Sequence, residues 1–402
     1  QESNYFAIFV VLQFRLNSIP FMNKKIIRIT TVPTSLGILL KGQLNFMSKY
    51  YEVLGVSSSG ANNELESVSL QEKVPVIPIE MTRKITPIKD LLAVWELYKL
   101  FKKEQPFIVH SHTPKAGTLS MIASKLAGTP HRLHTIAGLP LVEAKGLKRI
   151  LLNSVEKLTY SCATKIYPNS VGLKNIILKH KFTRLEKLKV IANGSSNGIE
   201  TAYFNPSLFD NEFIQNFRKE LNINEDDFVF VFAGRLVKDK GVNELVSAYN
   251  KLKKPNVKLL LIGTYENELD PLHIDTKMAI ENNNTIITPG WVNDVRPYFA
   301  ISNALTFPSY REGFPNTVMQ AAAMQIPCIV TDINGCNEII KEGETGIIIP
   351  TKSTDALYDA MVYMLNNQKE AKQMGLLSRQ LMISKFERKE VWNALLQEYN
   401  QL

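Results

Sequence analysis

Two cations stand five residues apart in a loop that follows a strongly apolar stretch. Arg235 and Lys240 lie in G-R-L-V-K-D-K-G, directly after the apolar and aromatic run 228–233. Arginine offers a planar fork of donors and lysine a point charge, and together they suit a diphosphate that gains negative charge during a reaction. Solvation of an exposed surface explains Lys238 in the same loop better than either of these two residues. We therefore predict a phosphate site at Arg235 and Lys240.

A second stretch with chemical potential reads R-E-G-F-P-N-T-V-M-Q, from Arg311 to Gln320. It follows the apolar run 304–308 and leads into a helix predicted to begin near Asn316, with Val318, Met319, Ala322 and Ala323 on its apolar side. A glycine turn before a helix N-terminus presents unpaired backbone N–H groups to an anion. Glu312, at the mouth of this turn, can accept hydrogen bonds from hydroxyl groups. A ligand with both phosphate and sugar parts would satisfy both features.

These two stretches together resemble the retaining glycosyltransferases of family 4. The signature of that family is E-x7-E around G-F-P, in which Glu312 matches the first acid and Gln320 stands in place of the second. The resemblance covers nearly the whole chain from about Lys24. It implies the α/β fold called GT-B, in which two Rossmann-like domains face each other across a cleft and a C-terminal helix crosses back to the first domain.

The resemblance also implies roles for individual residues. Arg235 and Lys240 would hold the donor diphosphate, Glu312 would contact sugar hydroxyls, and Gln320 would meet the nucleotide ribose. A neutral amide accepts a hydrogen bond more weakly than a carboxylate, so the replacement puts ribose binding in doubt more than the reaction. The other donor-binding candidates are Gly234, Gly263, Val292, Gly313, Phe314, Pro315, Asn316 and Thr317.

The first half of the chain carries candidates for the acceptor side. His112 and Lys115 follow the predicted strand 107–112, and the carboxyl ends of strands hold ligands in open α/β sheets. Gly37 lies in an earlier loop that relatives place beside donor phosphate and acceptor. A purely structural role is an equally good interpretation of each of these residues.

A catalytic histidine is expected near the turn after the strand 132–138. In many relatives it stands two residues after a threonine, and that position is Ala137 here. His134, three residues earlier, is the alternative catalytic candidate, although a histidine beside a strand often has only a structural role.

Composition limits the class of protein. A chain of 402 residues with 45% hydrophobic and 21% charged residues is typical of a globular protein with two domains. The three cysteines are scattered, which favours a reducing compartment. The G-x-G-x-x-G fingerprint of dinucleotide oxidoreductases is absent. The only paired aspartates, Asp226 and Asp227, precede a strand instead of following one, so we predict neither a metal nor another cofactor.

The turn-rich segment N-G-S-S-N-G at 193–198 predicts the domain boundary. We expect an acceptor-binding domain at 22–195, joined by the helix 386–402, and a nucleotide-sugar domain at 196–385. Residues 1–21 are interpreted as an upstream extension or a weak membrane-contacting tail.

Charge is distributed unevenly between the two halves. Residues 1–200 hold 27 Lys and Arg against 13 Asp and Glu, a net +14, whereas residues 201–402 have a net charge of −5. The basic amphipathic stretch 146–161 and the basic stretch 174–189 would suit an anionic membrane surface, and solvated faces are the alternative. Nucleic acid is disfavoured because no binding motif accompanies the charge. We expect a cytoplasmic protein, either free or peripheral on the inner face of the cell membrane.

An amphipathic helix is predicted at 87–104. Its apolar residues, which we expect to face the core, are Leu91, Leu92, Val94, Trp95, Leu97, Tyr98 and Phe101.

The predicted function is transfer of a sugar, most commonly from a UDP-sugar in this family, to a lipid-linked saccharide in surface polysaccharide biosynthesis. A small phosphorylated acceptor is the alternative within this class. A catalytically silent scaffold of the same fold is a second hypothesis, favoured by Gln320 and Ala137. A sugar-nucleotide epimerase is a third, and it would act without an acceptor.

Overall fold

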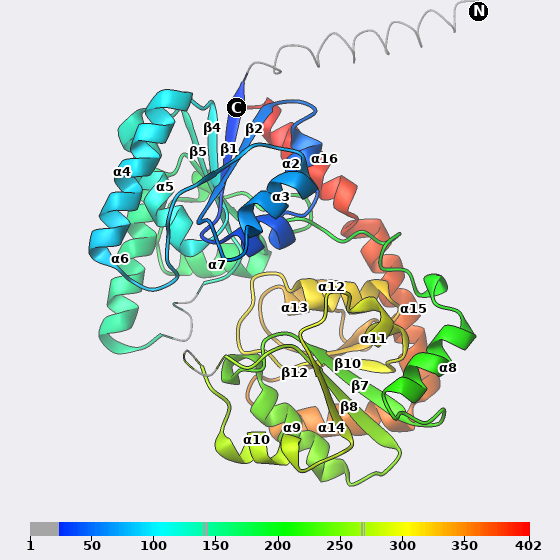
Figure 1. Ribbon diagram of the computed structural model, residues 1–402. Coiled ribbons are helices and arrows are strands. Elements are labelled where there is room, and N and C mark those ends of the chain that lie inside the picture. Colours follow the sequence, from blue (N-terminus) through cyan, green and yellow to red (C-terminus); the bar gives the residue numbers. More distant parts are fainter. Residues whose placement is uncertain (1–23, 140, 142–143, 267, 269) are drawn as a thin grey trace, which may run out of the picture.

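The computed structural model describes residues 24–139, 141, 144–266, 268 and 270–402 (Figure 1). The predicted extension at 1–21 lies outside these residues. In the described part of the chain, no helix combines the length and the apolar character needed to cross a bilayer.

The first half forms a parallel sheet of six strands in the order β3-β2-β1-β4-β5-β6. All five pairings are parallel. The strands β1, β2, β4 and β6 are buried along almost all of their length, as a sheet covered by helices requires, whereas the edge strand β3 is partly exposed. The strands are β1 Lys25–Ile29, β2 Glu52–Ser57, β3 Val76–Pro78, β4 Ile108–Ser111, β5 His131–Ile136 and β6 Lys165–Pro168.

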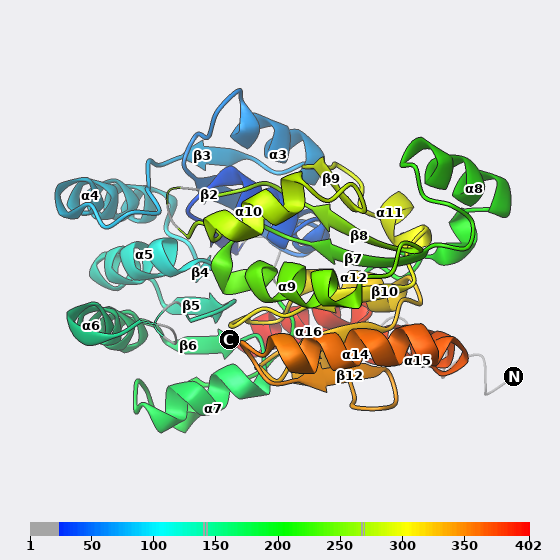
Figure 2. The same ribbon diagram turned by 90° about the horizontal axis from the view of Figure 1, so that it is seen from below.

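Helices cover both faces of this sheet (Figure 2). One face packs on α4 Pro87–Glu104, α5 Pro114–Ala127, α6 Gly146–Cys162 and α7 Val171–Lys179. The other face packs on the π-helical turn η1 Ser35–Leu39, on α2 Gln43–Met47, on α3 Glu64–Glu72 and on the last helix, α16 Arg388–Asn400. A short 3-10 turn, η3 Leu185–Lys187, follows α7.

The second half repeats the same strand order. Its parallel sheet reads β12-β11-β10-β7-β8-β9, so that its first strand, β7, is again central. The strands are β7 Phe228–Ala233, β8 Val257–Ile262, β9 Ile286–Gly290, β10 Ala304–Phe307, β11 Cys328–Thr331 and β12 Gly346–Ile349. The α/β fold with two Rossmann-like sheets is therefore as predicted.

The second sheet shares one continuous core with its helices. The 3-10 turns are η4 Pro206–Leu208 and η5 Lys238–Lys240, and the helices are α8 Asn211–Glu220, α9 Val242–Leu252, α10 Ile274–Glu281, α11 Arg296–Ala300, α12 Asn316–Ala323, α13 Cys336–Ile339, α14 Thr354–Asn366 and α15 Gln368–Lys385. The predicted apolar side of α12 is buried as expected. The sequence patterns did not predict α3, α8, α10 and α13, which are short and bury few residues each.

The C-terminal helix α16 crosses back to the first half of the chain, as predicted (Figure 1). Its Leu395 and Tyr399 belong to the core around β1 and β4. Its buried Glu398 accepts hydrogen bonds from Lys165 and from the Tyr167 hydroxyl, at 3.1 and 3.2 Å. The predicted boundary at 195/196 falls between β6 and β7, and its exact position stays a prediction.

Contacts between the two halves close part of the cleft. Glu338, at the start of α13, accepts hydrogen bonds from the backbone N–H groups of Val171 and Gly172, at 2.7 and 2.9 Å. These groups begin α7 in the first half, where a carboxylate is stabilised by the helix dipole. At Gly313 a side chain would lie 1.9 Å from the carbonyl oxygen of Ala137, so only glycine permits this approach.

The prediction that α4 turns Leu91, Leu92 and Trp95 toward the core is wrong. These side chains are 70%, 59% and 57% exposed, whereas Leu97 and Phe101 are buried. The stripe that packs on the sheet consists of Ala93, Leu97, Leu100 and Phe101. The apolar residues of α4 therefore occupy more of the helix circumference than the single face that packs on the sheet.

The stretch 174–189 is also not one amphipathic helix, because α7 ends at Lys179. The Lys187 ammonium donates to the carbonyl oxygens of Tyr160 and Ala163, at 3.1 and 2.8 Å. This lysine caps the C-terminal end of α6, and such a cap is a structural role.

Candidate active site

A cavity of about 450 Å³ lies between the two halves of the chain. Its floor consists of the carboxyl ends of β7 and β8, the segment after β9 and the first turns of α12. Ile38 and Lys41 reach it from the first half, and Arg388 reaches it from the start of α16. Its volume is within the range of small-molecule sites, and its position at a change of strand order is where open α/β sheets bind ligands.

The structure brings more than half of the predicted donor-binding residues to this cavity. Those that line it are Gly234, Arg235, Gly263, Val292, Asn316, Thr317 and Gln320. They come from four separate elements, which the sheet order places at one edge.

Gly263 shows why a glycine stands at the end of β8. A side chain there would lie 1.9 Å from the carbonyl oxygen of Gly234, and its φ of +140° is one that other residues rarely adopt. A glycine therefore permits the close approach of the two loops beneath the cavity.

Arg235 is the predicted phosphate-binding cation that lines the cavity, which Lys41 and Arg388 also border. Its side chain is 46% exposed and pairs with the carboxylate of Glu266 from the loop after β8. The first-turn N–H groups of α12 lack acceptors within that helix, and Asn316 and Thr317 border the same cavity. A positive side chain and a helix N-terminus thus face one space, an arrangement that suits phosphate oxygens.

Lys240 and Glu312 form a buried pair beside this edge. Their side chains are only 16% and 14% exposed, and the ammonium donates to the carboxylate. The same carboxylate accepts a hydrogen bond from the Ser309 hydroxyl at 2.9 Å. Neither residue lines the cavity. The two predicted functional groups are thus paired with one another.

The three residues of the G-F-P motif also lie outside the cavity lining. The ring of Phe314 is buried, with its centroid 5.3 Å from that of Phe386. Gly313 packs against Ala137, as described above, and Pro315 is the N-cap residue of α12. These residues shape the turn that presents Asn316 and Thr317.

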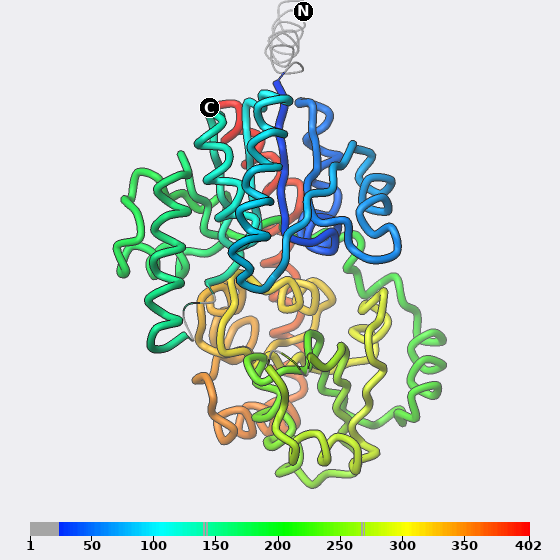
Figure 3. Tube along the Cα trace, turned by 60° about the vertical axis from the view of Figure 1, so that its left-hand side comes forward, coloured from blue at the N-terminus to red at the C-terminus, as the bar shows by residue number. Residues whose placement is uncertain are grey.

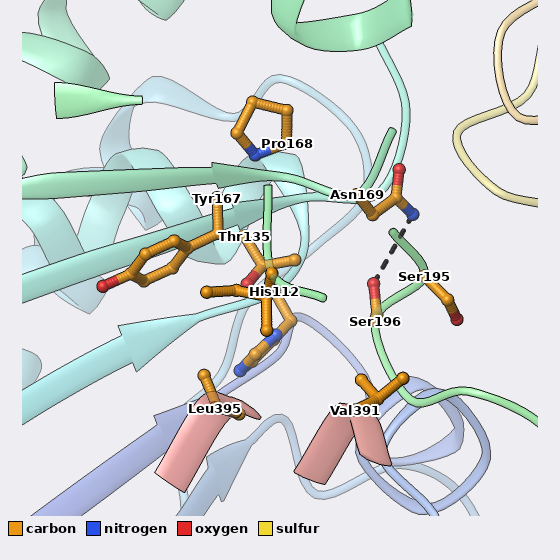
Figure 4. A pocket seen from close by; sticks show the side chains of 10 residues that line it. His112, Thr135, Tyr167, Pro168, Asn169, Ser195, Ser196, Val391 and Leu395 are labelled. Carbon is orange, nitrogen blue, oxygen red and sulfur yellow. Dashed lines mark hydrogen bonds between the residues drawn. The ribbon is translucent and has the colours of Figure 1, made fainter. Parts of the chain in front are cut away.

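The edge of the first sheet has a different character. His112 is buried, and its Nε2 accepts a hydrogen bond from the Arg28 Nε at 3.0 Å. The Arg28 guanidinium is fully buried and also donates to the amide oxygen of Gln43. His112 borders a small cavity of about 20 Å³, room for roughly one water molecule (Figure 4).

Helix α16 closes this small cavity on one side. Figure 4 shows Val391 and Leu395 of α16 opposite His112 and Asn169, with Ser196 of the interdomain segment beside them. Among the residues that the structure describes, the buried atoms Nδ1 of His112 and Oδ1 of Asn169 find no hydrogen-bond partner. A bound water would satisfy them.

The other predicted first-half residues lie outside both cavities. His134 is buried against Gly117 of α5, and its Nδ1 lies 2.9 Å from the Ser111 hydroxyl oxygen. Lys115 pairs with Asp90 of α4. Gly37 packs against the side chain of Val68 in α3. The structure therefore does not bring these three residues to the cleft.

Burial disfavours the charged form of three histidines of the first sheet. Burial lowers the pKa of His134 to about 4, and it holds the pKa values of His110 and His112 well below the usual range. The nearby Arg28 charge lowers the last two further. His110 lies within hydrogen-bond distance of the Tyr399 hydroxyl of α16 and of the Thr135 hydroxyl at 2.8 Å.

Several cavity residues were not among the predicted site residues. The Arg296 guanidinium lies 3.5 Å from the ring centroid of Tyr203, and its bidentate partner is Asp294. Burial works to raise the pKa of Asp294, but hydrogen bonds from Arg296 outweigh this and lower it. Tyr203, Asp294 and Trp291 line the cavity, together with Lys41. Only Lys41 had a signal in the sequence, since it stands in a glycine-containing loop.

Fold and cavity together define a glycosyltransferase of the GT-B type, and comparisons with known proteins agree. Residues 213–380 match the family Glycosyl transferases group 1, and residues 36–170 match the family Glycosyl transferase 4-like. The chain belongs to the group 1 glycosyltransferases and is an enzyme of that class.

Among individual relatives, the chain is 35% identical over 381 residues to the capsular polysaccharide biosynthesis glycosyltransferase CapM of Staphylococcus aureus. That match covers 94% of this chain and 97% of the relative. A galactosyltransferase of Escherichia coli, named for UDP-Gal and α-D-GlcNAc-diphosphoundecaprenol, is 28% identical over 72% of this chain and 74% of its own. Anabaena Alr3699/HepE, solved with UDP-glucose, shares the fold with a TM-score of 0.79 and 16% identity, over 94% of this chain and all of the other.

Proposed function

We propose that this enzyme transfers a sugar from a UDP-sugar to a hydroxyl group of a lipid-linked saccharide, with retention of the anomeric configuration. The observation that carries the proposal is the convergence of Arg235 and the α12 N-terminus on a cavity between two Rossmann-like sheets. The names of the relatives support a role in surface polysaccharide biosynthesis.

Arg235 and Lys240 would stabilise the departing diphosphate. Arg235 exchanges Glu266 for phosphate oxygens, which bind a guanidinium bidentately. Lys240 is held rigidly by Glu312, so its charge is already oriented before the donor arrives. One preorganised donor of this kind stabilises a transition state by about 2.7–4 kcal/mol. Because these residues supply the charge, the proposal requires no metal or other cofactor.

The remaining donor contacts follow from the cavity lining. Gln320 projects from α12 one turn after Asn316 and Thr317, in reach of the ribose of a nucleotide whose phosphates lie at the helix start. Glu312 would accept hydrogen bonds from sugar hydroxyls beside Lys240. Val292 and its neighbour Trp291 would border the base.

The reaction is a front-face substitution at the anomeric carbon. The bond from this carbon to the diphosphate oxygen breaks, and a bond to the acceptor oxygen forms on the same face. The acceptor proton passes to the departing phosphate oxygen, so no protein side chain has to act as a covalent nucleophile.

The acceptor would enter from the first half of the chain, which carries the excess of positive charge. A diphosphate-linked lipid carrier is attracted to such a surface. The enzyme would then work on the cytoplasmic face of the cell membrane, where nucleotide sugars are available.

Thermal unfolding with UDP, GDP and ADP tests the donor class. UDP at about 100 times its dissociation constant should stabilise the protein by roughly 2.7 kcal/mol, with a smaller effect of the other two. Arg235→Ala should abolish the shift, and Lys238→Ala, in the same loop but outside the cavity lining, should keep it. Stabilisation by GDP or ADP instead, or a UDP shift that survives in Arg235→Ala, would contradict the proposal.

The anomeric configuration of the product, measured by NMR, tests retention.

A further inference from the structure

Helix α4 carries an exposed apolar stripe that no part of the described chain covers. Ile88, Leu91, Leu92 and Trp95 follow one another at helical spacing and are between 57% and 77% exposed. Isolated apolar residues on a surface are normal, but a contiguous stripe marks an interaction site.

Helix α6 carries a second stripe of the same kind. Leu147, Ile150 and Leu151 are 85%, 62% and 48% exposed, and they repeat at i, i+3 and i+4. Figure 3 shows α4, α5 and α6 side by side in cyan and teal at the front of the molecule. We call the seven exposed apolar residues of α4 and α6 the apolar rim.

The apolar rim lies at the ends of the helices that face the cleft. In a parallel sheet the helices run back from the carboxyl edge, so the first turns of α4 and α6 lie at the edge where the cavity opens. Lys84, just before α4, comes within 4.0 Å of Glu268 in the second half of the chain, which places this turn across the cleft from it. The turn before α6 contacts the second half through Ala137 and Gly313.

Positive charge accompanies the apolar rim. Residues 83–99 hold four basic and two acidic residues, and one of the acids, Asp90, is paired with Lys115. Residues 145–157 hold four basic residues and one acid. The exposed lysines nearest the rim are Lys89 and Lys99 on α4 and Lys145 and Lys148 at α6.

Trp95 of the rim and its neighbour Tyr98 favour a lipid surface over a protein partner. The rings of Trp95 and Tyr98 are stacked, with centroids 5.4 Å apart, and the Lys99 ammonium lies 5.9 Å from the Trp95 ring centroid. Tryptophan, tyrosine and lysine together on a helix face are typical of the boundary between headgroups and acyl chains.

We propose that the apolar rim of α4 and α6 docks this enzyme onto an anionic lipid surface, with the mouth of the cleft turned toward the membrane. The inference rests on the proposed function in one respect, since it brings the cavity to a lipid-linked acceptor. The surface differs from the one expected from the sequence, because α4 replaces the stretch 174–189. Apolar side chains would enter the acyl boundary while the lysines meet anionic headgroups.

Co-sedimentation of the full chain with vesicles of phosphatidylcholine, with and without phosphatidylglycerol, tests this proposal. The wild-type protein should bind the anionic vesicles, and binding should fall with salt because charge attraction is screened. The variant Leu91→Ser/Trp95→Ser/Leu147→Ser should bind at least about tenfold more weakly, since interfacial affinity scales with buried apolar area. Lys89→Gln and Lys148→Gln should each weaken binding about fivefold.

A matched control removes exposed apolar residues elsewhere. Ile274→Ser/Met278→Ser on α10 of the second half should leave vesicle binding unchanged. All variants share residues 1–23, so that segment cannot account for a difference between them.

Three outcomes would overturn the proposal. The wild-type protein could bind vesicles equally well with and without phosphatidylglycerol, or the triple variant could bind as well as the wild type. In the third outcome, the wild type is a dimer in solution and the triple variant is a monomer. The last would assign the rim to a second copy of the chain. Failure here leaves the UDP-dependent thermal shift intact, so the two proposals fail separately.

Discussion

The carboxyl edges of the two sheets share one strand order and yet differ in chemistry. At the edge of the second sheet, the charged Arg235 lies exposed beside a cavity of about 450 Å³. At the edge of the first sheet, His112 lies buried on Arg28 beside a cavity of about 20 Å³. The difference arises because α16 crosses over and packs on the first sheet. The topology provides two possible ligand sites, and the C-terminal helix closes much of one of them.

The charged and polar groups of the two edges also differ in the kind of partner that they have within the fold. Arg235 and Lys240 are paired with the carboxylates of Glu266 and Glu312. In the first sheet, His110 lies within hydrogen-bond distance of the Thr135 and Tyr399 hydroxyls, and His134 within that of the Ser111 hydroxyl. The third histidine, His112, accepts from the Arg28 guanidinium.

The largest expected effect is on the side of the second sheet. Lys240→Ala should lower kcat by about 10²–10³, because it removes a preorganised charge from the leaving diphosphate. It also leaves the Glu312 carboxylate partly buried without its cation, so the melting temperature should be measured in parallel. Lys238→Ala, an exposed neighbour in the same turn, should keep normal turnover. A folded Lys240→Ala enzyme with a normal kcat would remove this lysine from the proposed mechanism.

The second largest expected effect concerns the first sheet and is a dependence of the free energy of unfolding on pH. His134 has a pKa of about 4 in the folded chain, so between the usual value near 6.5 and about pH 4 the unfolded chain binds a proton that the folded chain does not. Stability should therefore fall on acidification, by about 1.4 kcal/mol per pH unit for each such histidine, and stay level above pH 7. Urea unfolding at pH 5.5, 6.5 and 7.5 measures this slope.

The matched pair His134→Gln and His273→Gln sharpens this test. The first removes a buried histidine and should reduce the slope, and the second removes an exposed histidine of the second half and should leave it unchanged. Equal slopes in both variants would show that His134 is not buried in the neutral form.

The smallest expected effect concerns the unusual amide of the signature. Gln320→Glu should strengthen UDP binding by about 0.5–1.5 kcal/mol, because a carboxylate accepts the ribose hydrogen bonds more strongly than an amide. Isothermal titration with UDP measures the change, and UMP serves as a ligand with the same ribose. A large loss of affinity would mean that Gln320 has a different role from contact with the ribose.

The sequence by itself determined the local elements and the class of enzyme. Short-range patterns predict the strand 228–233, the glycines of the loop after it and the helix start at Asn316. The structure has these elements where they were predicted. Local signals suffice there because a strand end, a glycine turn and a helix start follow each other directly in the chain.

Only the tertiary structure decided which side chains face the cleft. His134 lies within β5 and Lys115 in the first turn of α5, and their partners there, Gly117 and Asp90, hold them in the body of the domain. Tyr203 and Arg388 reach the cavity from the interdomain segment and from α16, far from any motif. The helix α4 has apolar residues around most of its circumference, so its period could not tell which of them packs on the sheet. Contact with α5 made that choice and left Leu91 and Trp95 exposed on the surface.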